Sequence, residues 1–201
     1  MSIDHLVHPE ADIHTKLAFA ACQGDEPACR KYLGEGADPN ASMPFPLCSS
    51  LEAAAMMGHA DVARLLLEAG ADPDTGSSDG ESAPIHIAAW KGHAEVVRIL
   101  TRAGADPNIK DEFGCSPLHK AAEYDPDEDD PELEKDFLEI CRILIDAGAD
   151  LRAEDEHEET PEDVAAAPAI ADLLRAARES RELASAASGK RRKNRGKKVR
   201  L

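Results

Sequence analysis

The chain has 201 residues, a net charge of −17, 42% hydrophobic residues and only 3% aromatic residues. A core with so few rings must be built mainly from Ala, Leu, Val and Ile, which favours closely packed helices over a β-sandwich. No stretch approaches the about 20 apolar residues of a membrane span, and the N-terminus lacks the basic and then apolar layout of a signal peptide, so we expect an intracellular, cytoplasmic protein.

Three short motifs return at a constant interval along the chain. The segment Gly-Ala-Asp-Pro-Asn at 36–40 returns at 70–74 with a final Asp and again at 104–108, and a degraded copy stands at 148–152. The glycines at 24, 58 and 92 keep the same interval of 34 residues, each after an Ala-rich stretch. Pro-Ile-His at 84–86 is matched by Pro-Leu-His at 117–119. Markers in a common register predict an array of structural repeats.

The unit at 83–108 shows what each repeat contains. Pro84 suits the first turn of a short helix, and Gly92 can take the left-handed conformation that ends it. A second helix is predicted from Ala94 to Ala103, followed by Gly104 and a turn. Helices of eight to ten residues are marginal alone in water. We therefore expect them to be stable only when stacked on neighbouring units.

These markers resemble those of the ankyrin repeat family, which places a Thr-Pro-Leu-His-like start, a Gly-His pair and a Gly-Ala-Asp-Pro-Asn turn in each repeat. The resemblance implies an all-α solenoid of stacked helix-turn-helix units joined by short β-turn fingers. It covers residues 13–178, after an N-terminal extension at 1–12 and before a basic tail at 179–201. The five repeats are expected at about 13–40, 47–74, 81–108, 114–152 and 158–178, the first and last resembling caps.

An insertion interrupts the fourth repeat. Its markers lie 44 residues from the preceding ones, which leaves about eleven extra residues against the usual period of about 33. We place them in the acidic segment 124–136, between the two helices of the repeat. A calcium loop would need a mid-loop glycine and a terminal glutamate at fixed spacing, and the segment has no glycine but two prolines. A solvated loop is the prediction, with contact to a basic partner as an alternative.

The resemblance also implies a binding surface, because the two residues before the glycine of each inner helix face the concave groove of the array. Aromatic and methionine side chains at these positions are typical anchors for a protein partner. The alternative is that Met56 or Trp90 simply covers the neighbouring helix. We predict partner contacts at the groove positions Gln23 (beside Cys22), Met56, Met57, Trp90, Lys91, Glu123 and Tyr124, and at the finger residues Phe45 and Phe113.

Catalytic and metal sites are not indicated. There is no P-loop, GxGxxG, zinc spacing or nucleophile motif. His86 and His119 stand where the family uses histidine to hydrogen-bond the backbone of adjacent repeats, and the five cysteines are odd in number and contain no CxxC pair. We expect no enzyme activity, cofactor or metal, and free cysteines that fill the core.

The charge is divided between an acidic body and a basic tail. Residues 189–201 contain no acid and eight bases: Lys190, Arg191, Arg192, Lys193, Arg195, Lys197, Lys198 and Arg200. The other 15 bases stand against all 40 acids in residues 1–188, a net charge of −25 there. We expect the tail to be disordered. Three roles stay open for it: a nuclear-import signal at 190–193 in a eukaryotic host, a contact to nucleic acid, or a competitor that occupies the protein's own groove.

Taken together, the pattern predicts a monomeric scaffold that binds another protein in its groove and at its finger tips. The acidic body favours a partner with a basic surface, because opposite charges speed encounter and like charges oppose contact. The alternative is an adaptor associated with nucleic acid or the nucleus, in which the tail anchors or targets the protein.

Overall fold

The computed structural model describes residues 11–41, 48–76, 82–125 and 131–197, with side chains placed up to residue 125 and from 133 to 187. Within these ranges the chain forms helices joined by turns. The described residues contain no β-strand, only an isolated β-bridge residue at Ser49. The predicted all-α repeat fold is confirmed. The helices are α1 (Ile13–Gln23), α2 (Glu26–Gly34), α3 (Ser50–Met57), α4 (Ala60–Glu68), α5 (Pro84–Trp90), α6 (Ala94–Ala103), α7 (Pro117–Ala122), α8 (Pro131–Ala147) and α9 (Pro168–Lys197).

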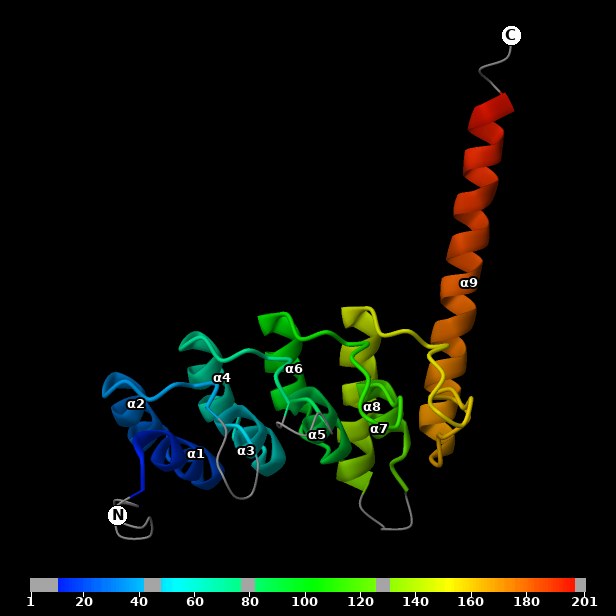
Figure 1. Ribbon diagram of the computed structural model, residues 1–201. Helices are drawn as coiled ribbons and strands as arrows, with labels where there is room; N and C mark the ends of the chain where they lie inside the picture. Colours follow the sequence, from blue (N-terminus) through cyan, green and yellow to red (C-terminus); the bar gives the residue numbers. More distant parts are fainter. Residues whose placement is uncertain (1–10, 42–47, 77–81, 126–130, 198–201) are drawn as a thin grey trace.

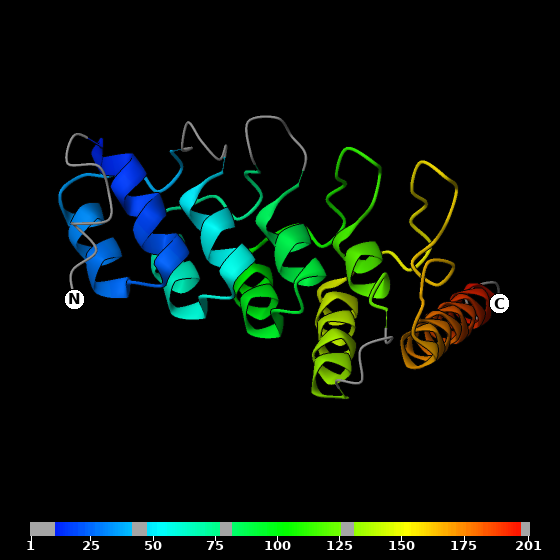
Figure 2. The same ribbon diagram turned by 90° about the horizontal axis from the view of Figure 1, so that it is seen from below.

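The first eight helices form four pairs that stack into two layers. The inner helices α1, α3, α5 and α7 contact one another in that order, and the outer helices α2, α4, α6 and α8 do the same (Figure 1). Seen from below, the inner helices lie side by side, and the segments 109–116 and 152–159 project along one edge of the row (Figure 2). The array ends with α9, which packs on α8 and then continues away from the stack (Figure 1).

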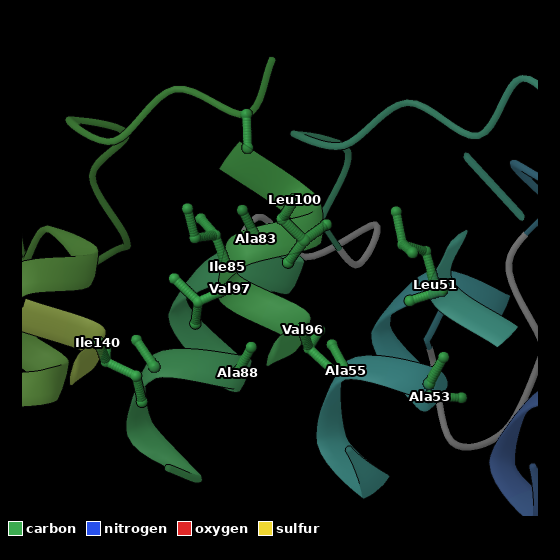
Figure 3. Close-up of a cluster of buried hydrophobic side chains, with 14 of the residues drawn as sticks. Leu51, Ala53, Ala55, Ala83, Ile85, Ala88, Val96, Val97, Leu100 and Ile140 are labelled. Atoms are coloured by element: carbon green, nitrogen blue, oxygen red, sulfur yellow. The ribbon is translucent and has the colours of Figure 1, made fainter. Parts of the chain in front are cut away.

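The core runs through the stack as one continuous cluster of small and aliphatic side chains. Between α5 and α6, Ile85 and Ala88 lie near Val96, Val97 and Leu100, all at most 1% exposed (Figure 3). Alanine on the inner helices lets neighbouring backbones approach closely, while branched side chains from the outer helices fill the space. Each pair therefore buries its apolar surface only against its neighbours, as expected for a repeat array.

The repeated turn after each outer helix links one unit to the next. The glycine that opens each copy has a positive φ between 95° and 102°, the left-handed conformation that glycine adopts without strain. The last residue of the motif then accepts a hydrogen bond from the backbone amide of the next unit's aspartate. These pairs are Asp72 N to Asn40 Oδ1 (2.8 Å), Asp106 N to Asp74 Oδ1 (2.9 Å) and Asp150 N to Asn108 Oδ1 (2.6 Å).

Different residues complete this series of hydrogen bonds at the two ends of the array. At the first unit the Asp38 amide donates to His14 Nδ1 at 3.0 Å. At the last unit Arg152 stands where Asn or Asp would be and pairs with Glu182 of α9. Arg181 donates to the carbonyls of Ile145 and Ala149, both at 2.6 Å, and so satisfies backbone groups at the end of α8.

The C-terminal region differs from the sequence-based expectation. The fifth unit has turns rather than an inner helix at 160–165, and no boundary falls at residue 178, because α9 continues as helix to Lys197. The expected disorder from residue 179 is therefore wrong over 179–197. Residues 178–187 are rich in Ala, Arg, Glu and Leu, which are strong helix formers, and Arg181 and Glu182 tether this stretch to the fourth unit.

The acidic insertion is also only partly a loop. Residues 126–130 lie outside the described part of the chain, whereas 131–136 form the first turns of α8. Proline is favoured in the first turn of a helix, and Glu and Lys are good helix formers. The insertion thus lengthens α8 to 17 residues, against 10 in α6.

Among the helices of the described ranges, none is both long and apolar enough to cross a membrane.

Candidate functional site

The C-terminal ends of the inner helices present a row of exposed side chains. Met56 and Met57 at the end of α3 are 44% and 50% exposed, and Trp90 at the end of α5 is 55% exposed. We call this surface the end row; it comprises Cys22, Gln23, Met56, Met57, Trp90, Lys91 and Glu123, all exposed except the partly buried Cys22. Because the inner helices lie side by side in the stack (Figure 2), their C-terminal ends follow one another along the array.

The exposure of these side chains follows from helix geometry. On α3, Ala54 and Ala55 are fully buried against the neighbouring helices, so the next two residues, Met56 and Met57, point to the other side of the helix. On α5, Ala88 and Ala89 are buried in the same way and Trp90 is exposed. The small residues bring the helices together, and the large ones remain in solvent. Large exposed apolar side chains that the core does not use are typical of interaction surfaces.

Two histidines hold the backbone beneath the end row. The ring of His59 lies against Gly24, and its Nε2 is 3.1 Å from the Cys22 carbonyl. His93 repeats the arrangement one unit later, where its Nε2 is 3.2 Å from the Met56 carbonyl. Any side chain at Gly24 or Gly58 would meet the ring at 2.8 Å or less, so glycine is required there. This role of the two histidines was not predicted from the sequence. The Gly-His pairs are visible in the sequence, but the carbonyls that the histidines contact are not.

Trp90 and Lys91 form a unit of their own within the row. The Lys91 Nζ lies 3.9 Å from the centre of the indole ring, within the range of a cation–π contact. The ammonium group covers one face of the indole, so the ring is held in place while more than half of its surface stays in solvent.

Tyr124 corrects one of the predicted contacts. The residue is only 8% exposed, and its ring stacks on Phe137 of α8 with the centroids 4.4 Å apart. Phe137 also lies beside Gly92. In the units before it, a histidine lies beside the equivalent glycine: His59 beside Gly24 and His93 beside Gly58. The lengthened α8 therefore brings an aromatic pair into the fourth unit in place of the histidine contact. The ring of Tyr124 belongs to the core, so little of its surface is open to a partner.

The finger at 109–116 is a second, rigid element of the surface. The buried Asp111 accepts hydrogen bonds from the amides of Phe113 (3.0 Å) and Cys115 (2.8 Å), and it pairs with Lys120 of α7 at 3.0 Å. Burial has the largest single effect on the pKa of Lys120 and lowers it, but the hydrogen bond to Asp111 together with the negative charges of Glu123 and Asp111 leaves the pKa raised. Phe113 at the tip is 57% exposed, and its contact with a partner stays a prediction. Phe45, the other predicted finger residue, lies outside the described residues.

The next finger, at 152–159, packs beside this one and carries an acidic tip. The Glu156 amide donates to the Phe113 carbonyl at 3.1 Å, and Lys110 Nζ donates to the Glu154 carbonyl at 2.8 Å. Asp155 holds the tip closed by accepting from the amides of Glu159 and His157, and these backbone bonds lower its pKa. Four exposed glutamates remain on the tip: Glu154, Glu156, Glu158 and Glu159.

His86 and His119 act within the fold. In each, Nδ1 accepts the amide of the residue before the helix, Ala83 (3.2 Å) for His86 and Ser116 (3.0 Å) for His119. The other ring nitrogen then carries the proton and donates to the carbonyls of the following finger, Ile109 and Cys115 for His86 and Glu159 for His119. Burial lowers the pKa of His86, which favours this neutral form. The predicted backbone-bonding role of both residues agrees with the geometry.

The buried cysteines are thiols in the core. Burial raises the pKa of Cys29 and of Cys141 to about 12, and that of Cys48 to about 11. A thiol with such a pKa is not a nucleophile at neutral pH.

A family model described as "Ankyrin repeats (3 copies)" matches residues 17–111 and again residues 85–180. The two matches together span all four helix pairs and the first turns of α9. No curated protein matches the chain.

Proposed function

Because the chain belongs to the ankyrin repeat family, whose repeats are protein–protein interaction modules, we propose that it binds a protein partner across the end row and the neighbouring fingers. The observation that carries this proposal is the distribution of exposed apolar surface. In the described residues, the large hydrophobic side chains that stay exposed are Met56, Met57, Trp90, Phe113 and Leu183. The first four lie on the inner helix ends or on a finger, and only Leu183 lies elsewhere, on α9.

The partner that we propose has a basic surface. Residues 1–188 carry a net charge of −25, so an acidic or phosphate-rich partner would be repelled at long range. A protein with exposed Lys and Arg would instead be attracted, and its encounter rate would fall as salt screens the charges.

The first prediction concerns Trp90. A buried interface tryptophan commonly contributes 2 kcal/mol or more to binding, so Trp90→Ala should weaken partner affinity by at least about tenfold. The unfolding temperature should change little, because the ring is more than half exposed. The measurement is affinity capture with quantitative mass spectrometry, followed by titration with the captured partner. Leu183→Ala removes an exposed apolar side chain outside the proposed surface and should leave affinity unchanged; equal effects of both variants would refute the proposed site.

A second function is favoured by the basic tail. Eight bases and no acid occupy residues 189–201, and the helix that leads to them extends away from the array. In this alternative the tail contacts nucleic acid or an import receptor, while the repeats recruit the partner. Deleting 189–201 should then abolish salt-sensitive retention on nucleic acid or nuclear accumulation of a fluorescent fusion. If both persist, the tail has neither role.

A further inference from the structure

The end row changes along the array from apolar to charged side chains. At α3 and α5 it carries the apolar Met56, Met57 and Trp90. About one helical turn before the end row, Phe19 of α1 and Ile87 of α5 are also apolar and only partly buried. An apolar strip of this kind contributes to affinity when a partner's large aliphatic or aromatic side chains cover it.

A cation at the centre of the surface opposes a basic contact there. The Lys91 ammonium lies on the Trp90 ring. Lys120 lies beside Phe113, with Nζ 5.9 Å from the ring centre, but its charge is paired with Asp111. A Lys or Arg of the partner placed over Trp90 would meet the charge of Lys91. Like charges in close contact disfavour binding, so the partner's bases must lie elsewhere.

A concentration of acidic side chains lies beyond Lys91, toward the C-terminal end of the array, whereas Asp61 and Glu95 at the starts of α4 and α6 are paired with Arg64 and Arg98. Glu123 is exposed at the end of α7, and the finger at 152–159 presents its four glutamates beside Phe113. Asp155 and the contacts to the finger at 109–116 fix the position of that tip. The charge that attracts a basic partner is thus displaced from the apolar strip.

From this displacement we infer that the partner binds through a two-part segment: large apolar residues that cover Met56, Met57 and Trp90, joined to a basic block that reaches Glu123 and the finger at 152–159. The inference rests on the proposed function and adds the chemistry and the placement of the partner segment. The distance from α3 to the fifth unit is three helix spacings of about 10 Å each. An extended segment therefore needs about 10 residues to span it.

The probe for a test is a phage-displayed library of random 16-residue peptides, selected on the immobilised full-length chain. We expect the enriched peptides to contain a cluster of large apolar residues next to a separate cluster of Lys and Arg. Enriched peptides that are acidic, or that carry their bases among the apolar residues, would contradict the two-part segment. No enrichment over the bare support would count against both this inference and the proposed function.

Variants then assign each part to its surface, with the best peptide as a fluorescent probe. Glu156→Lys with Glu158→Lys should weaken binding about tenfold at low salt, since each exposed charge pair contributes up to about 1 kcal/mol, and the difference should shrink at 0.5 M NaCl. A peptide with Gln in place of its bases should bind the variant and the unchanged protein equally well. Glu35→Lys with Asp146→Lys makes the same charge change at exposed positions by the ends of α2 and α8 and is the control.

The two proposals fail in different ways. If Met57→Ala and Trp90→Ala leave binding of the peptide unchanged, the end row is not the site and the proposed function loses its support. If these variants weaken binding, but the Glu156 and Glu158 variant behaves like the control, the protein-binding site stands and the two-part segment is wrong.

Discussion

Ser50 is a single residue at which the fold leaves a polar group without a partner. It is the first residue of α3 and is 1% exposed, and within the described residues its hydroxyl has no hydrogen-bond partner. The corresponding first residues of α5 and α7 are the buried Pro84 and Pro117. Ser49 before it is already extended, at φ −78° and ψ 164°, which is the conformation that a following proline requires.

We therefore expect Ser50→Pro to raise the free energy of unfolding by about 1 kcal/mol. Proline restricts the unfolded chain, and the substitution removes a buried hydroxyl that lacks a partner. Urea unfolding followed by circular dichroism measures the change. Ser49→Ala provides the opposite comparison, because it removes the cap that accepts the Glu52 amide at 3.1 Å and should lower stability by about 1 kcal/mol. A lower midpoint for Ser50→Pro would show that the ring does not fit.

His86 predicts how stability responds to acid. Burial lowers its pKa in the folded protein below the ordinary 6.5. As the pH falls below 6.5, the unfolded chain takes up a proton that the folded chain does not. Stability should therefore be constant above this pH and fall below it, by at most about 1.4 kcal/mol per pH unit for this one proton. Urea midpoints at pH 7.5, 6.5 and 5.5 test the direction. His86→Gln should show a shallower fall, and an equal slope in both proteins would exclude His86 as the cause.

At the scale of the elements, one aromatic contact anchors the N-terminal part of α8. Phe137 is 5% exposed, stacks on Tyr124 and lies beside Gly92. Phe137 therefore joins the lengthened α8 to the C-terminal ends of the inner helices α5 and α7. Phe137→Ala should lower the free energy of unfolding by about 3 kcal/mol or more, and amide exchange over 131–140 should speed up. Asp136→Ala changes the exposed neighbour on the same helix and should have an effect below about 0.5 kcal/mol. Similar losses in both variants would contradict the packing role.

The helix pairs could be predicted from the sequence because each carries its own boundaries. The glycines at 36, 70 and 104 all take the left-handed conformation that the repeated motif requires. Exposure of Met56 and Trp90 followed from the same register. Tyr124 could not be placed in this way, because its neighbour Phe137 directly follows an insertion that the other units lack. The length of α9 could not be predicted, because the run of bases at 189–201 is typical of a solvated tail although the residues before it are good helix formers.

At the scale of the whole molecule, the dominant feature is self-repulsion. Residues 1–188 carry a net charge of −25, which the tail reduces to −17 for the full chain. Repulsion among like charges destabilises a compact state, and salt screens it. The urea midpoint should therefore rise between 20 mM and 500 mM NaCl. It should rise more for a chain that ends at residue 188, which lacks the compensating bases. An equal rise in both would show that the tail's charge does not reach the array.

The repeated links between units have a consequence for how the molecule could grow. Asn40, Asp74 and Asn108 each bond to the aspartate of the following unit, and His59 and His93 each reach the helix end one unit back. Tandem duplication of 75–108 would therefore give every copy a suitable neighbour on both sides. Asn108 would accept from the duplicated Asp106, and the duplicated His93 would reach the end of α5. One genetic event of this kind would lengthen the array and add a second tryptophan to its surface, without a new interface having to be invented.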